Sequence, residues 1–256
     1  MTKVGIQLFT LRDELEQDFE GTLRKVAELG YQGVEFAGFY GRSSEQVAAI
    51  LKETGLVAIG SHTPYQLLRD QLDEIIEFNI AIGSKYIILP YIAEEDRNRW
   101  SEIAEDMKKI AQQCEQKDLV FLYHNHDFEL LQHIEGETVL DWLYEQIPAS
   151  QLKVELDTCW VHHAGYDPLA YIERYNSRIL LWHLKDMKKN EDGSPQTVEL
   201  GQGEVNNKAI ADAMLKINVE WAIVEQDYCA NDPIESVKTS MDWVKNYAKQ
   251  GGNLDV

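Results

Sequence analysis

Two carboxylates stand two residues apart at the end of an apolar stretch near the middle of the chain. The segment VELDTCWVHHAG, residues 154–165, contains them as Glu155 and Asp157. Residues 153–155 read as a short buried strand, and strand residues two apart point to the same face. Carboxylates that share a buried face cost free energy unless a cation or a hydrogen-bond network compensates them. This segment therefore predicts a functional site.

Other residues that can act as acids, bases or ligands follow apolar stretches in the same way. They are Glu35, His62, His124, His126, Asp157, His183, Lys185, Glu225 and Asp227. One subset follows the fifth to eighth predicted strands in succession: His124, Asp157, His183 and Glu225. Two imidazoles and two carboxylates form a ligand set that suits Mn²⁺, Zn²⁺, Co²⁺ or Fe²⁺ better than Ca²⁺.

The elements that must position these residues alternate between strands and helices. Apolar runs predict strands at 4–9, 33–36, 56–60, 86–89, 119–123, 153–155, 179–182 and 221–224. Helical spacing predicts helices at 18–29, 44–54, 64–82, 94–116, 139–146, 168–175, 207–217 and 234–248. The strands read as continuous apolar runs, which indicates a parallel sheet covered by helices.

This pattern predicts a single-domain α/β fold, a closed (β/α)8 barrel over residues 1–250, with a frayed tail at 251–256. A doubly wound open sheet is the alternative, but no GxGxxG follows the first strand. In such a barrel the loops after the strands meet at one end, where the active site lies. Residues 187–203 have no apolar periodicity and are expected to form a long loop. Trp182 and Trp221 are expected to pack between barrel and helices.

Composition limits the partners and the compartment. The formal net charge of −20, without a basic cluster, makes nucleic acid a poor partner. No apolar run of 18 residues or more and no signal peptide is recognised, so neither a membrane span nor secretion is expected. The three cysteines form no CxxC pair, which suits a reducing cytoplasm. A homo-oligomer is left open.

Five motifs carry a resemblance to a known family: LYHNHDFEL (122–130), VELDTCWVHHAG, LWHLKD (181–186), LGQGEVN (200–206) and VEQD (224–227). Over essentially its whole length the chain resembles the xylose isomerase-like barrels. These sugar phosphate isomerases/epimerases include keto-sugar 3-epimerases and inosose dehydratases. The resemblance implies one catalytic divalent metal, Mn or Zn first and Co, Fe or Mg as alternatives. Its implied ligands are His124, Asp157, His183 and Glu225.

The chain departs from the family pattern at two positions. His124 stands where the epimerases have a glutamate that is both a ligand and one of two opposed bases. Trp160 stands where many members have a substrate-binding histidine, so either His162 or His163 compensates, or Trp160 forms a wall on which a sugar stacks. His126 shares a face with His124 and is a rival for the fifth-strand ligand.

The resemblance also implies roles. Glu225 is the expected base, and His124, His126 or Lys185 would return the proton. Lys185 could instead form a salt bridge to Asp186 or Glu155. The expected contacts to a small carbohydrate or polyol substrate are Glu35, His62, His126, Glu155, Trp160, His163 and Lys185.

The leading hypothesis is a metal-dependent isomerase or epimerase that acts on a keto-sugar or related polyol through an enediolate. A lyase that dehydrates a keto-inositol or keto-sugar is the first alternative, because the same enediolate can expel a β-hydroxyl group. Two further alternatives need no catalysis or no metal. The first is a sugar-binding barrel without catalysis, and the second is a polar cap of ion pairs without a metal. An endonuclease IV-type phosphodiesterase would need more metal ligands and a basic face, and the sequence has neither.

Overall fold

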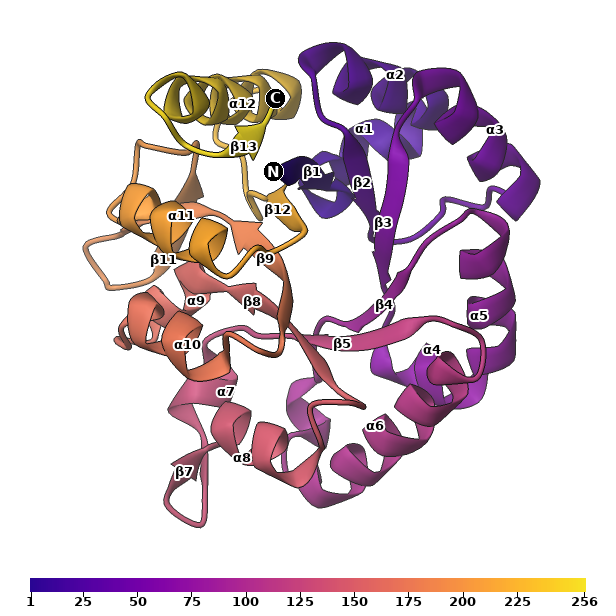
Figure 1. Ribbon diagram of the computed structural model, residues 1–256, viewed down its shortest axis with the longest axis vertical. Coiled ribbons are helices and arrows are strands. Elements are labelled where there is room, and N and C mark those ends of the chain that lie inside the picture. Colours follow the sequence, from indigo (N-terminus) through magenta and orange to yellow (C-terminus); the bar gives the residue numbers. More distant parts are fainter.

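Eight parallel strands pair side by side and close on themselves in the computed structural model, which describes residues Met1–Val256. The strands are β1 (Thr2–Gln7), β2 (Gly33–Phe36), β3 (Val57–His62), β4 (Tyr86–Leu89), β5 (Val120–His124), β8 (Lys153–Asp157), β9 (Ile179–Leu184) and β12 (Trp221–Val224). Each pairs with the next, and β12 pairs with β1, which closes the barrel (Figure 1). The predicted single-domain (β/α)8 barrel is confirmed.

Helices surround the strands on the outside of the barrel (Figure 1). The longer ones are α2 (Phe19–Leu29), α3 (Ser44–Thr54), α5 (Leu72–Ala81), α6 (Trp100–Glu115), α8 (Val139–Gln146), α10 (Pro168–Tyr175), α11 (Asn207–Lys216) and α12 (Pro233–Lys249). Shorter helical segments are η1 (Leu8–Leu11), α1 (Arg12–Gln17), α4 (Tyr65–Asp70), η2 (Glu94–Asp96), α7 (Phe128–Leu131) and α9 (Thr158–His163). No helix combines the length and apolar composition needed to cross a membrane.

Local sequence signals explain where helices begin and end. At α3, Ser43 accepts a hydrogen bond from the backbone N–H of Gln46, whose side chain accepts one from the Ser43 N–H, a reciprocal cap. Helices α2 and α3 end at Gly30 and Gly55, both in the left-handed conformation that glycine adopts without strain.

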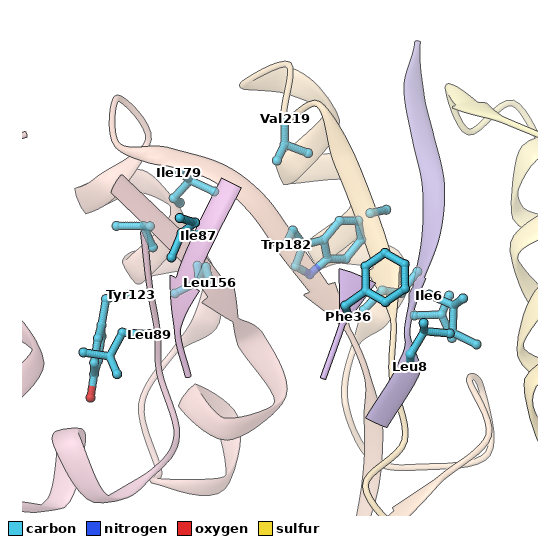
Figure 2. Close-up of a cluster of buried hydrophobic side chains, with 14 of the residues drawn as sticks. Ile6, Leu8, Phe36, Ile87, Leu89, Tyr123, Leu156, Ile179, Trp182 and Val219 are labelled. Atoms are coloured by element: carbon cyan, nitrogen blue, oxygen red, sulfur yellow. The ribbon is translucent and has the colours of Figure 1, made fainter. Parts of the chain in front are cut away.

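Two apolar cores hold the barrel. The larger one fills the space between strands and helices, and Figure 2 shows part of it, including Trp182, Phe36 and Tyr123. The smaller one lies inside the barrel and contains Ile59, Tyr86, Ile88, Leu122, Leu181, Trp221 and Ile223. The prediction for Trp182 is confirmed, whereas that for Trp221 is wrong, because its ring lies over Gly33 inside the barrel.

Three expectations about the outer elements are wrong. The helix expected at 64–82 breaks at Gln71, because its halves pack against different neighbours, α4 against α6 and α5 against α3. The loop expected at 187–203 contains an antiparallel hairpin of β10 (Asp186–Lys189) and β11 (Pro195–Val198), whose mostly polar residues give no apolar periodicity. The tail is not frayed: β13 (Leu254–Asp255) pairs with β1, and Leu254 is buried.

Several element ends also differ from prediction. The first strand ends at Gln7 because η1 follows it, and the helix expected from residue 94 begins at Trp100 after η2. Strand β8 continues to Asp157 and β9 to Leu184. Asp157 and His183 are therefore strand residues, held by backbone pairing, and the two are direct partners in the register.

Candidate metal centre and its cavity

The four implied metal ligands meet at the carboxyl ends of neighbouring strands. His124 and Asp157 are the last residues of β5 and β8, His183 is in β9, and Glu225 directly follows β12. One donor atom from each lies within 4.8 Å of the donor atoms of the others. All four side chains are buried. The structure thus brings together the whole set that the sequence indicated.

His183 contacts both this cluster and a second layer of polar residues below it. Its Nδ1 lies 2.8 Å from Glu225 Oε2, on the side of the cluster. Its Nε2 lies 2.8 Å from Glu35 Oε2 and 3.3 Å from Glu155 Oε2, on the other side. A histidine held in this way by a carboxylate on one nitrogen has a fixed ring orientation and can present the other nitrogen to a cation.

The second layer consists of two fully buried glutamates bridged by His62. His62 Nε2 lies 2.7 Å from Glu155 Oε2 and 3.1 Å from Glu35 Oε2. The Gln7 side-chain amide donates a 2.7 Å hydrogen bond to Glu35 Oε2. His124 Nδ1 also approaches Glu155, at 3.2 Å. Glu35 and Glu155 do not line the cavity above, so the structure places these two predicted substrate contacts underneath the candidate ligands.

Charge within this layer is compensated by histidine rings. Burial alone would lower the pKa of His62, but Glu35 and Glu155 outweigh it and raise the pKa to about 9. Burial, reinforced by the neighbouring Glu35, raises the pKa of Glu155. Burial also disfavours the charged form of His183, but Glu155 and Glu225 raise its pKa well above the usual value. The two buried glutamates are therefore compensated by two imidazole rings, His62 and His183.

A buried lysine neutralises the upper part of the site. Lys185 Nζ lies 2.8 Å from Glu225 Oε2, 3.0 Å from Asp157 Oδ2 and 2.9 Å from Asp227 Oδ2. Burial would lower its pKa, but these carboxylates raise it well above the usual value, so the ammonium group stays charged. The expected salt bridge to Asp186 or Glu155 is therefore wrong.

Asp186 has a different partner set. Its carboxylate accepts backbone hydrogen bonds from Met187, Gly201, Gly203 and Val205. It therefore anchors the segment after the β10–β11 hairpin and does not face Lys185.

The donor set fits a divalent cation. His124 Nδ1 and Asp157 Oδ2 are buried and make no contact with normal hydrogen-bond geometry. Five carboxylates gather here: Glu35, Glu155, Asp157, Glu225 and the partly exposed Asp227. They outnumber the three groups whose raised pKa keeps them cationic, Lys185, His62 and His183. Burial, with Glu225 nearby, raises the pKa of Asp227 as well. A divalent ion between two nitrogens and two oxygens would offset this excess of negative charge.

A cavity of about 640 Å³ opens directly above the cluster. Its polar end is formed by His62, His124, His126, Glu225 and Asp227. Burial lowers the pKa of His126 to about 3, so this ring is neutral. The cavity continues away from the cluster toward the loop after β2 and helix α5.

The remaining predicted contacts lie to one side. The Trp160 ring is 5.4 Å from Lys185 Nζ and 5.5 Å from the His126 ring, but it borders a smaller neighbouring cavity of about 330 Å³. His163 packs edge-on against Trp160, with 3.7 Å between its Nε2 and Asp127 Oδ2, and lines neither cavity. Their roles as substrate contacts stay predictions.

Sequence reasoning missed two supporting residues. Gln7 orients Glu35, and the Asn125 side chain exchanges two hydrogen bonds with the backbone of Asp157, at 3.0 and 3.1 Å. Asn125 lies within the HNH run, which was its only signal. Glu129 holds the loop after β5, because it accepts hydrogen bonds from the Tyr123 hydroxyl and the His126 backbone.

Comparison with known proteins agrees with this geometry. A sequence model of the family described as xylose isomerase-like TIM barrel matches residues 23–247. An inosose dehydratase from Clostridium tetani is 23% identical over 263 residues, covering 86% of each chain.

Solved structures give the same fold. A sugar phosphate isomerase/epimerase from Parabacteroides distasonis superposes with a TM-score of 0.81 at 20% identity, covering 96% of this chain and 98% of the other. The IolI protein, solved with a bound zinc atom, superposes with a TM-score of 0.73 at 15% identity, covering 97% and 99%. The resemblance inferred from the motifs is confirmed, and the chain belongs to the xylose isomerase-like TIM barrel family.

Proposed function

We propose that this protein is a divalent-metal-dependent enzyme that removes a proton next to the carbonyl group of a small keto-sugar or keto-polyol. The observation that carries the proposal is the convergence of His124, Asp157, His183 and Glu225 next to an open cavity, which His124 and Glu225 line. A bound divalent ion would act as a Lewis acid toward a carbonyl oxygen and the neighbouring hydroxyl. Return of the proton at a neighbouring carbon, or to the opposite face, makes the enzyme an isomerase or epimerase.

Glu225 is the proposed base. It lines the cavity, and although burial would raise its pKa, Lys185 and His183 hold that pKa well below the usual range, so the carboxylate is ionised. Lys185 also keeps a positive charge 2.8 Å from this carboxylate, which favours its ionised, proton-accepting form. His126, neutral and at the opposite edge of the polar end, can accept a hydrogen bond from a substrate hydroxyl.

A second candidate is a lyase, favoured by the lack of a carboxylate opposite Glu225. On the β5 side the cavity offers the imidazole rings of His124 and His126 and no carboxylate. Elimination needs only one base. Glu225 takes the proton, the electron pair of the broken C–H bond forms the new C=C bond, and the β-hydroxyl group leaves with a proton as water. Glu225 lines the cavity and, once it has taken up the substrate proton, can donate it to this hydroxyl group. The inosose dehydratase relatives support this alternative.

Metal content tests the first half of the proposal. Elemental mass spectrometry on wild type, Asp157→Ala and Glu225→Ala should show about one equivalent of Mn, Zn, Co or Fe in wild type and none in the variants. Asp212→Ala, an exposed acid on α11, is the control and should retain the metal. Wild type that stays empty after incubation with each ion would contradict the proposal and leave a non-catalytic sugar-binding barrel.

The reaction type is tested by NMR in D₂O with keto-sugars and keto-inositols. Deuterium incorporation with an isomeric product supports the isomerase or epimerase, and an unsaturated or dicarbonyl product supports the lyase. Glu225→Gln should slow either reaction by about 10²–10⁴-fold. Metal binding without solvent exchange on any substrate would contradict the proposed proton transfer.

A further inference from the structure

The cavity is larger than a free sugar needs. At about 640 Å³ it lies within the ~300–1,000 Å³ range in which proteins bind drug-sized ligands. The candidate metal cluster and its polar neighbours occupy only one end. A free ketose or inosose bound there would leave the rest of the cavity to water.

Away from the candidate metal cluster, the wall of the cavity is apolar and largely aromatic. The apolar lining residues are Phe9, Phe39, Leu67, Ile75, Phe78 and Tyr91, of which Tyr91 reaches the polar end, with its ring 5.3 Å from that of His126. Phe39, in the loop after β2, packs against Phe78 of α5 with 4.1 Å between ring centroids. These two segments are far apart in sequence and form one continuous surface above the barrel.

Part of this wall is exposed to solvent, which is unfavourable for large apolar side chains. Phe9 is 40% exposed, Leu67 38% and Tyr91 46%. They account for three of the ten large hydrophobic residues exposed anywhere on the chain, and all three line this one cavity. A concentration of exposed apolar surface in a concave site marks a place where a ligand covers it.

The only cationic side chain in the cavity lining is His62, and it is already paired with Glu35 and Glu155. None of its lining residues is lysine or arginine. Lys185 lies outside the lining and contacts three carboxylates. The acidic residues at the cavity are Glu74, Glu225 and Asp227. An anionic substituent would meet like charge, whereas an uncharged apolar group meets a complementary surface.

We propose that the substrate is a keto-sugar or keto-polyol that carries an uncharged, apolar substituent about the size of an aromatic ring. The substituent packs against Phe39, Ile75 and Phe78, while the oxygenated part lies at the candidate metal cluster. The identity of the oxygenated part rests on the proposed function, whereas the apolar wall does not depend on metal or turnover.

The test uses matched pairs of glycosides that bind without reacting. Methyl and phenyl β-D-glucopyranosides, galactopyranosides and xylopyranosides are titrated into the full-length protein by isothermal titration calorimetry. Burying a phenyl group in place of a methyl group should tighten binding by about 10- to 50-fold in at least one pair. Phe78→Ala should reduce this ratio to below about 3-fold and leave the affinity for the methyl glycoside unchanged.

Two controls keep the result specific. Ile80→Ala changes an exposed apolar residue of the same helix that does not line the cavity, and it should keep the wild-type ratio. Ile75→Ala replaces Phe78→Ala if that variant does not fold. Glucose 6-phosphate should bind no tighter than glucose.

Equal affinities within every pair, no detectable binding of any glycoside, or tighter binding of the phosphate would overturn the inference. Metal content and solvent exchange are measured separately, so an apolar preference in a protein that holds no metal would reject the proposed function and retain this inference.

Discussion

The inside of the barrel has two layers built from the same strands but held together by different forces. Three strands each contribute one inward residue to both layers, two positions apart: Leu122 and His124 on β5, Leu181 and His183 on β9, and Ile223 and Glu225 at β12. The lower layer is the smaller apolar core described above, called the plug here. The upper layer is the whole network of ion pairs and hydrogen bonds, from Glu35 and His62 up to Lys185.

The two layers differ in what their stability depends on. Apolar burial is non-directional and insensitive to pH. Buried ion pairs stabilise only while every charge has its partner, since desolvation costs several kcal/mol per ion in proteins. The contribution of the plug is therefore the same at any pH, whereas that of the network depends on the protonation of its charged groups.

The largest expected effect comes from removing the one lysine of the upper layer. Lys185→Met leaves three carboxylates without their cation, and we expect a loss of about 3–5 kcal/mol in the free energy of unfolding at pH 7. The loss should be smaller at pH 5, because the unpaired carboxylates can then take up protons. Urea unfolding at both pH values measures it.

The control for this variant is Lys208→Met, which breaks an exposed pair with Asp212 and should cost less than about 1 kcal/mol. Similar losses in the two variants would mean that the buried cation has no special role.

A truncation in the plug should be nearly as large but independent of pH. Leu122→Ala removes a fully buried side chain and should cost about 2–4 kcal/mol. The same urea titrations at pH 5, 7 and 9 should give equal differences from wild type. A difference that changes with pH would show that the two layers are energetically coupled.

The pH dependence of the upper layer is expected to appear at His62. Its pKa is raised to about 9 in the folded protein, against a value near 6.5 in the unfolded chain. The protonated ring therefore contributes stability that is complete below about pH 6.5 and is lost as the pH rises through about 9, on the order of 3 kcal/mol.

Urea unfolding at pH 6, 7, 8 and 9 compares wild type with His62→Gln. The stability advantage of wild type should shrink across this range. His133→Gln, at an exposed histidine, should run parallel to wild type. A constant difference between wild type and His62→Gln would argue that His62 is neutral in the folded protein.

The smallest expected effect lies at the border of the two layers. Gln7→Met extends the apolar plug upward and removes the 2.7 Å hydrogen bond to Glu35, so we expect a loss of about 1–2 kcal/mol. Thermal unfolding measures it against Gln113→Met, an exposed position on α6. Higher stability of Gln7→Met would show that apolar packing is the better solution at this level.

The barrel and its candidate ligands could be predicted because both depend on local signals. Apolar runs and glycine ends define the repeats, and a polar residue directly after each run lies at the end where all loops meet. His124, Asp157, His183 and Glu225 satisfy this rule, and the structure brings them together. Depth along the strand is not visible in sequence, which is why Glu35 and Glu155 were expected at the cavity.

The cavity wall could not be predicted. Phe39 and Phe78 come from a loop and a helix that only the closed barrel brings together, and in sequence they look like core residues. The partners of Lys185 were missed for a similar reason. Asp157, Glu225 and Asp227 belong to two other strand ends, and nothing in the sequence around Lys185 favours them over the adjacent Asp186.

The pairing of β13 with β1 brings the two ends of the chain together, with Thr2 beside Leu254 (Figure 1). They meet at the amino-terminal end of the barrel, opposite the candidate metal cluster. A short linker could therefore join them, and new termini could be opened at the exposed turn of the β10–β11 hairpin, at Gly193. A circularly permuted protein of this kind would keep every strand of the barrel intact, and a reporter domain fused at the new ends would sit beyond the hairpin that directly follows Lys185.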